Sequence, residues 1–138
     1  MLKARKVFGV LGGMGALASA RFVETLYRRN LSTHEQAQPI VLLRSNPQLP
    51  DRTRALLDGR HEALAEALSA ELEALRDSGA DRMVMCCFTA HLVWDALPPE
   101  LSARTVSLLD ALYRSPGLGD RRRLVICTGF KRRLLLYF

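Results

Sequence analysis

Short apolar runs that lack polar alternation constrain the fold of this chain more than any other feature. The first run, Lys6 to Leu11, ends at the glycine turn Gly12-Gly13-Met14-Gly15. A short run of this kind is typical of a strand that is covered on both faces. Four later runs have the same character and are also predicted to be strands: Ile40–Leu43, Met83–Cys87, Thr105–Leu109 and Leu124–Cys127.

Helical patterns lie between these runs. Ala16 to Asn30 has apolar residues on one side, and Arg60 to Ser78 is rich in Ala, Leu and Glu, with leucines at three- and four-residue spacing. Ala90 to Leu97 is a shorter helix that two prolines close. The alternation of strands and helices predicts an α/β fold. We expect a parallel sheet of four to five strands with helices on both faces, a flavodoxin-like three-layer domain.

Composition narrows the choice of compartment and partner. The net charge is +6, but residues 1–120 hold 14 basic and 14 acidic side chains, so the excess lies in Arg121–Arg123 and Lys131–Arg133. This distribution argues against a nucleic-acid partner. The three cysteines are an odd number without CxxC spacing, which fits neither a disulfide framework nor a zinc site and favours the cytoplasm. No run approaches the ~20 apolar residues of a membrane span.

The N-terminus imitates a secretory signal, because basic residues precede an apolar stretch that ends in Ala18-Ser19-Ala20. Four glycines interrupt that stretch, and glycine is a poor helix former. A buried strand that runs into a glycine turn accounts for every residue, so we favour that interpretation over export.

Three unusual loops follow the first three predicted strands: Gly12–Gly15, Asn46–Arg52 and Cys87–His91. The second is predicted to be irregular, because two prolines three residues apart exclude both a helix and a sheet ladder. In parallel sheets ligands bind beyond the carboxyl ends of the strands. The sequence therefore predicts one site at this rim of the sheet.

The first two loops offer groups that bind anions. Gly13 and Met14 belong to a turn before a helix, where free N–H groups suit phosphate or carboxylate. The dinucleotide pattern is incomplete, since Ala18 takes the third glycine position, and a purely structural turn is the alternative. In the second loop, with Asn46 and Gln48, Arg52 provides a planar fork for a carboxylate. The alternative for Arg52 is a surface pair with Asp51.

The third loop holds the candidate nucleophile. Cys87 is expected to end a buried strand near the N-terminus of the next helix, and such a position lowers the pKa of a thiol. The alternative is a small buried hydrophobe, which we adopt for Cys86 because it points to the opposite side of the strand. Thr89 is placed to cap the next helix or to bind an anion. His91, two residues further on, is placed to polarise either Cys87 or Thr89.

Together the three loops resemble the aspartate/glutamate racemase superfamily, and within it the aspartate racemase branch. That family has a Gly-Gly-Met-Gly-Pro turn, matched by Gly12–Gly15 with Ala16 in place of proline. Its Asn-Pro-Gln-hydrophobic-Pro-Asp-Arg loop is matched in full by Asn46–Arg52, and its Cys-Asn-Thr-Ala-His motif by Cys87–His91, with Phe88 in place of asparagine. A Gly-Ala-Asp helix exit is also present, and the likeness extends over residues 5 to about 110.

The resemblance implies a racemase or epimerase that acts on aspartate or a related acidic amino acid without pyridoxal phosphate or metal. Two thiols flank the α-carbon; one removes the proton and the other delivers one to the opposite face. Cys87 is then the N-terminal thiol, Thr89 and the Gly13–Met14 turn hold the α-carboxylate, and Arg52 holds the side-chain carboxylate. Family members are often homodimers.

Two departures from the family affect this interpretation. Phe88 removes a hydrogen-bond donor beside the substrate. The second thiol of the family lies in a second domain, in a Gly-Cys-Thr-Glu motif that this sequence lacks. We interpret residues 1–115 as the N-terminal racemase domain and residues 116–138 as a linker and basic tail of a truncated or frameshifted product. A catalytically inactive amino-acid- or anion-binding remnant, and other one-thiol chemistry such as decarboxylation, remain alternatives.

Overall fold

The computed structural model describes residues 6–115. Within this range four parallel strands form one sheet in the order β2-β1-β3-β4. The strands are β1 (Val7–Gly12), β2 (Ile40–Ser45), β3 (Arg82–Met85) and β4 (Thr105–Val106). The helices are α1 (Ala16–Arg29), α2 (Arg52–Leu57), α3 (His61–Asp77), α4 (Pro99–Ser102) and α5 (Leu108–Tyr113), with the 3-10 segments η1 (Glu35–Ala37) and η2 (Thr89–Ala96).

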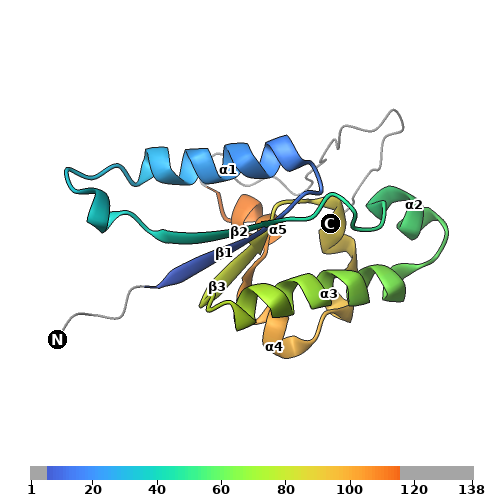
Figure 1. Cartoon of the computed structure of the whole chain (residues 1–138). Coiled ribbons are helices and arrows are strands. Elements are labelled where there is room, and N and C mark those ends of the chain that lie inside the picture. The colour runs from blue at the N-terminus through green and yellow to red at the C-terminus, as the bar shows by residue number, and fades with distance from the viewer. Residues whose placement is uncertain (1–5, 116–138) are drawn as a thin grey trace.

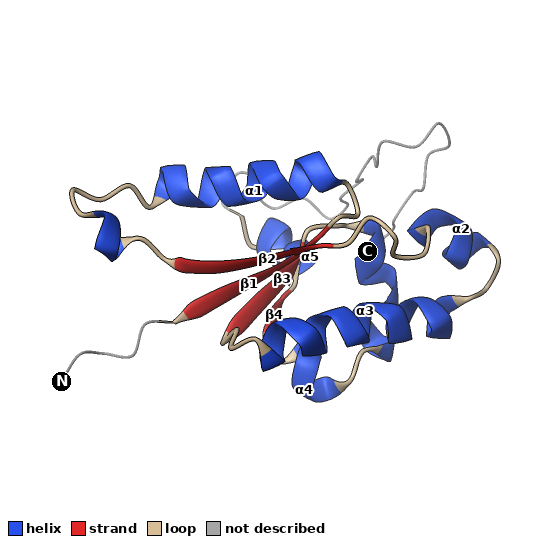
Figure 2. Cartoon of the chain, viewed as in Figure 1, coloured by secondary structure: helices blue, strands red, loops and turns tan. Residues whose placement is uncertain are grey.

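Helices cover both faces of the sheet, as the sequence predicts. Figures 1 and 2 show α1 on one face and α3 with α4 on the other. The predicted α/β class and parallel sheet are confirmed, with four strands in the described part of the chain. The fifth predicted strand, Leu124–Cys127, and the predicted tail lie outside the described residues.

The main core lies between the sheet and α3. Leu11 of β1 and two methionines of β3 face leucines of α3 that recur at three- and four-residue spacing and are almost fully buried: Leu64, Leu68, Leu72 and Leu75. Burial of one such leucine contributes about 1.5–3 kcal/mol, so this helix face anchors the fold. Val10 and Val84 alternate with these residues and are buried on the opposite side of the sheet.

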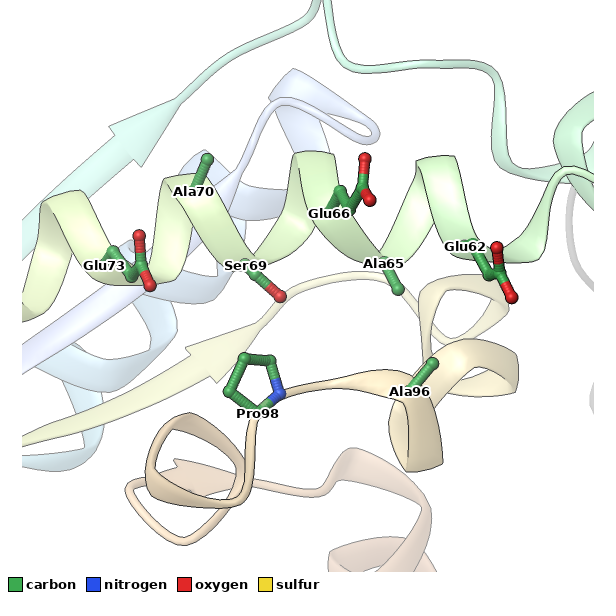
Figure 3. A pocket seen from close by; sticks show the side chains of 8 residues that line it. All are labelled: Glu62, Ala65, Glu66, Ser69, Ala70, Glu73, Ala96 and Pro98. Carbon is green, nitrogen blue, oxygen red and sulfur yellow. The ribbon is translucent and has the colours of Figure 1, made fainter.

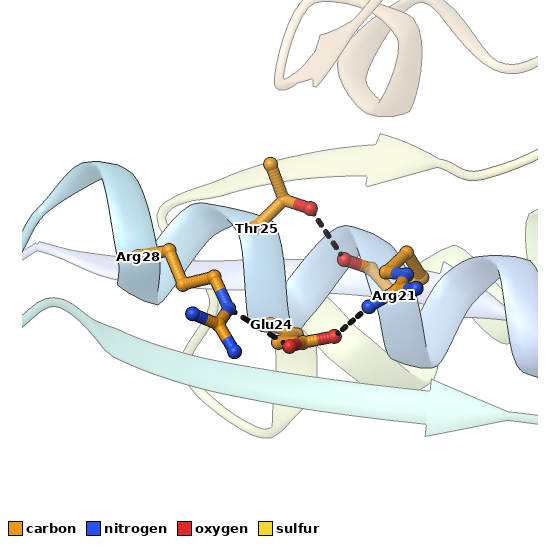
Figure 4. Close-up of polar contacts among 4 residues, drawn as sticks. All are labelled: Arg21, Glu24, Thr25 and Arg28. Atoms are coloured by element: carbon orange, nitrogen blue, oxygen red, sulfur yellow. Dashed lines mark hydrogen bonds and ion pairs between the residues drawn. The ribbon is translucent and has the colours of Figure 1, made fainter.

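The α1 side has a thinner cover. Among the 14 residues of α1, Ser19 is the only buried one. The outer surface of the helix carries exposed ion pairs: Glu24 accepts hydrogen bonds from Arg21 (2.7 Å) and Arg28 (2.8 Å) (Figure 4). These neighbours lower the pKa of the Glu24 carboxyl, first through the bond from Arg21. Exposed pairs of this kind add little to stability, so α1 depends on a narrow apolar contact.

Helix boundaries differ from the predictions at three places, each with a local cause. The predicted loop Asn46–Arg52 is wrong at its last residue, because Asp51 caps α2: its Oδ1 accepts from the Arg54 N–H at 2.7 Å. Pro99 does not merely close the preceding helix but opens α4 from its first position, where proline is favoured. The preceding segment, η2, is 3-10 and kinked at Val93.

Two strands are shorter than predicted. The strand expected at Thr105–Leu109 ends at Val106, since Ser107 caps α5 by accepting from the Asp110 N–H at 3.1 Å. The third strand ends at Met85 rather than Cys87. The Cys87 N–H donates to the Met85 carbonyl at 2.9 Å, which turns the chain away from the sheet. Both cysteines therefore lie just beyond the strand.

No helix in residues 6–115 combines the length and the apolar character that a membrane crossing requires.

Candidate functional site

The three predicted loops begin side by side. In the sheet register, Gly12 pairs with Ser45 and Leu11 with Met85, so β1, β2 and β3 end at the same level. The Asn46 N–H donates to the Gly12 carbonyl at 3.3 Å, and the Cys86 N–H donates to the Leu11 carbonyl at 2.9 Å. The loops are thus joined at their origins by main-chain bonds.

The glycine turn is shaped by close backbone approach. Gly13 has φ +89°, and a Cβ atom there would lie 2.3 Å from the Asn46 carbonyl carbon, so only glycine fits. The Gly13 N–H donates to the Ser19 hydroxyl at 3.3 Å, which removes one of the two predicted anion donors. The Met14 N–H has no acceptor among residues 6–115, although the Met14 side chain is buried in the core. The Met14 N–H is therefore a free donor of this turn.

Both polar groups of the Asn46 side chain already have hydrogen-bond partners within the protein. Its Nδ2 donates to Glu71 Oε1 at 2.8 Å, and its Oδ1 accepts from the Gln48 N–H at 3.0 Å. Glu71 also binds Arg44 Nε, so one carboxylate of α3 links the end of β2 to the loop. Burial raises the Glu71 pKa, but the bonds from Arg44 and Asn46 outweigh it and the pKa is lowered. The Gln48 side chain is exposed.

Sequence reasoning missed this network, although a signal was present. Glu71 lies on the leucine stripe of α3, directly before Leu72, and is a charged residue on the buried face of a helix. Charged residues at such positions are almost never fully buried unless paired. The position of Glu71 therefore indicates a polar partner, but it does not indicate which one.

Arg52 lies at the first position of α2 and is half-buried. Its Nη1 donates to the Pro50 carbonyl at 3.1 Å, whereas its Nε is buried and has no hydrogen-bond partner in the described chain. The alternative pair with Asp51 is absent from the ion pairs of residues 6–115, because Asp51 caps the helix instead. A buried N–H without a partner calls for a ligand or an ordered water.

The two thiols are free and half-buried. Cys87 packs against the core on the α3 side, together with Trp94, whereas Cys86 is outside that cluster. Burial raises the pKa of the Cys86 thiol to about 12, with a smaller contribution from Cys87. Cys86 is therefore a poor nucleophile at neutral pH.

Thr89 and Phe88 follow at the start of η2. Thr89 is 6% exposed and does not cap the segment, whose N-cap is Phe88 with no side-chain bond. The capping alternative is therefore excluded, and the Thr89 hydroxyl has no partner among residues 6–115. The ring of Phe88 lies 6.4 Å from that of His91, at an angle of 38°.

The His91 ring has a partner at each of its two nitrogens and on one face. Its Nδ1 lies 2.8 Å from the Cys87 carbonyl oxygen, and its Nε2 lies 3.0 Å from the Leu108 nitrogen. The ring stacks on Trp94 at 5.3 Å and is 4% exposed. Burial lowers the pKa of the imidazole, against smaller opposite effects from the Cys87 carbonyl and Asp110. Both ring nitrogens are therefore engaged with main-chain groups.

A groove of about 380 Å³ lies elsewhere, between α3 and the segment from η2 to α4 (Figure 3). Its α3 wall carries Glu62, Glu66 and Glu73, and Ala96 and Pro98 form the facing wall. The residues that line it include no cation and no thiol. Three carboxylates repel an acidic ligand, so we place the candidate site at the rim of the sheet and not in this groove.

Metal ligands are not clustered in this part of the protein. Residues 6–115 contain no group of three or more His, Cys, Asp or Glu side chains that could hold a metal ion.

Comparison with known proteins finds relatives among racemases. The family model for Asp/Glu/hydantoin racemases matches residues 11–136. An aspartate racemase from Picrophilus torridus is similar in structure, with 29% identity, a TM-score of 0.61, and coverage of 67% of this chain and 40% of that one. An aspartate racemase homologue from Pyrococcus horikoshii shares the fold at 21% identity, with a TM-score of 0.55 and coverage of 78% and 46%. The chain thus spans less than half the length of either protein.

Proposed function

The chain belongs to the Asp/Glu/hydantoin racemase family, and from this we propose that it forms one half of a cofactor-independent racemase or epimerase for aspartate or a related acidic amino acid. Cys87 is the acid/base thiol of this half. The supporting observation is that Cys87 follows the strand whose end is joined, through β1, to the glycine turn and to the loop of Arg52. One thiol and two kinds of anion donor thus belong to loops that begin at a single rim.

The chemistry requires these groups together. The α-proton of an amino acid is very weakly acidic, so its removal by the Cys87 thiolate must be accompanied by stabilisation of the charge that grows on the α-carboxylate. The Met14 N–H and the Thr89 hydroxyl are free to donate to that carboxylate. The unpartnered Nε of Arg52 suits the side-chain carboxylate of the substrate. Racemisation also needs a second acid on the opposite face of the α-carbon, and we assign it to a complementary half.

With a single acid/base thiol, the chain should catalyse only part of the racemisation reaction, and this partial reaction can be tested. In D2O, the 138-residue chain with L-aspartate should exchange the α-proton for deuterium with retention of configuration, because one base returns a deuteron to the face it deprotonated. Proton NMR measures the exchange and polarimetry measures the configuration. Cys87→Ala should abolish the exchange, whereas the matched variant Cys86→Ala should keep it. Equal exchange in the parent and Cys87→Ala would refute the assignment.

Two other outcomes point to different arrangements. Inversion whose rate rises with the square of the protein concentration would indicate that two copies of the chain form the complete site. Binding of aspartate without any exchange would favour the second candidate, an amino-acid-binding remnant. Phe88 is the observation that favours it, because an aromatic ring stands where the resembling motif has an amide donor.

The two described thiols are both free. Free thiols persist in a reducing compartment, so we also propose that the protein is cytoplasmic.

A further inference from the structure

We propose that His91 is a positioning residue, which fixes the main chain of Cys87 to the start of α5 through a single tautomer of its ring, and that it does not contact the substrate. The inference deepens the proposed function, because it rests on Cys87 as the acid/base thiol.

The hydrogen bonds determine the tautomer. The Leu108 N–H can only donate, so His91 Nε2 must accept and cannot carry a proton. The Cys87 carbonyl can only accept, so Nδ1 must carry the proton and donate. The ring is therefore neutral with its proton on Nδ1. The protonated form would set an N–H against the Leu108 N–H, and the other neutral tautomer would break both bonds.

Burial leaves no room for another role. The ring is 4% exposed and lies flat on Trp94, with an interplanar angle of 8°. Because both nitrogens are occupied, neither can reach a carboxylate at the rim without leaving a part-buried main-chain group unpaired. Such a group would lose its hydrogen bond to water without gaining one in the protein, which is unfavourable.

Through the His91 ring, the two bonds connect the start of α5 to the chain just beyond β3. Leu108 is the first residue of α5, and its N–H is one of the groups that a helix leaves unpaired at its N-terminus. The Cys87 carbonyl lies beyond the end of β3, one residue past the last main-chain bond to β1, which runs from the Cys86 N–H to the Leu11 carbonyl. The hydrogen bond from His91 therefore fixes the main chain of Cys87, the residue whose sulfur must approach the α-carbon. Misplacement of a reacting group by about 1 Å can cost roughly a hundredfold in rate.

Two conservative variants separate the two bonds. An asparagine amide occupies the place of Nδ1, so His91→Asn keeps the donor to the Cys87 carbonyl and loses the acceptor for Leu108. A glutamine carbonyl extends to the place of Nε2, so His91→Gln keeps the Leu108 bond and loses the Cys87 bond. His91→Ala loses both. We expect His91→Ala and His91→Gln to slow α-proton exchange by roughly ten- to a hundredfold, and His91→Asn to restore most of the rate.

The tautomer is measured directly by long-range ¹H–¹⁵N correlation NMR on the ¹⁵N-labelled chain, with His34→Gln and His61→Gln to assign the other two histidines. We expect a neutral ring protonated at Nδ1 at pH 7.5, with shifts that L-aspartate does not change. A proton on Nε2, a charged ring, or ring shifts that move with L-aspartate would each overturn the proposal. The proposal would also be overturned if His91→Asn exchanged the α-proton no faster than His91→Ala.

Failure of the proposed function gives a different result. If the parent chain exchanges no α-proton, the racemase assignment fails, but the tautomer and the pH profile of Cys87 alkylation still test the role of His91. A profile that changes in His91→Ala and returns to that of the parent in His91→Asn supports positioning. An unchanged profile in all three variants contradicts it.

Discussion

Cys86 and Cys87 are neighbours in the chain, yet their thiols have different surroundings. A thiol with a pKa of about 12 is ionised in about one molecule in 10,000 at pH 8. Iodoacetamide at neutral pH should therefore label Cys87 first, and L-aspartate should slow that labelling. Peptide mapping by mass spectrometry measures both rates, with Cys127→Ser to remove the third thiol. Faster labelling of Cys86 would contradict the assignment.

Substitution of Phe88 tests the proposed carboxylate-binding site. A donor aimed at charge in the transition state contributes about 3–4 kcal/mol, or two to three orders of magnitude in rate. Phe88→Asn should therefore strengthen binding of an acidic amino acid and speed α-proton exchange, and Arg52→Ala in the same background should reverse the gain. Calorimetric titration with D- and L-aspartate provides the measurement. If Phe88→Asn binds neither enantiomer more tightly than the parent, the carboxylate site is wrong.

His91 makes stability depend on pH. Its pKa in the folded protein is below the ordinary value of 6.5, because the ring is buried. The unfolded chain therefore takes up the proton first as pH falls, so the contribution is complete above pH 6.5 and is lost between 6.5 and the folded pKa. Asp110, the charged group that acts on the ring, only reduces this effect.

Urea unfolding at pH 7.5 and 5.5 tests the dependence. The parent should lose stability between these two pH values, and His91→Asn should lose less, because the asparagine side chain at this position does not titrate. Glu71 does not interfere, since its pKa is lowered from 4.5 and its contribution is lost only at more acidic pH. Equal losses in the parent and His91→Asn would contradict a buried neutral imidazole.

The glycine turn that joins β1 to α1 has a matched control at the end of α3. Gly13 and Gly79 have similar φ values, +89° and +98°, but an added Cβ meets the Asn46 backbone at Gly13 and nothing within 4 Å at Gly79. Gly79→Ala should cost about 1–2 kcal/mol from the backbone conformation alone. Gly13→Ala should cost more and weaken aspartate binding, because the Asn46 loop must move. Chemical denaturation and calorimetry measure the two effects.

The longer elements could be predicted from the sequence and the short ones could not. The periodicity of α3 predicts its bounds to within one residue at each end, because its leucines pack on the sheet. The helices α2 and α5 depend on single caps, Asp51 and Ser107, which a sequence without structure also allows as loop residues. The end of β3 depends on a turn bond between Cys87 and Met85, for which the sequence has no local signal.

The arrangement of the sheet and the meeting of three loops at its rim follow from the order of strands and helices, and both could be predicted. The use of each polar side chain could not. Asn46 is bound by Glu71, a residue 25 positions away, and His91 by Leu108, 17 positions away. Such pairings depend on tertiary distances, so residue type alone indicates a candidate donor but not whether the protein already uses it.

The thin cover of the α1 face links ligand binding to local unfolding. Since α1 buries only Ser19, its amides should open by small fluctuations that leave α3 folded, and they should exchange with solvent faster than those of α3. The Met14 N–H lies just before α1, next to this weakly held helix. Under the proposed function, a carboxylate bound at the Met14 N–H should order the helix and slow its amide exchange, so part of the binding free energy would be used to hold α1 closed. Mutations that stabilise α1 should then increase the affinity for an acidic amino acid, even where they lie far from the rim.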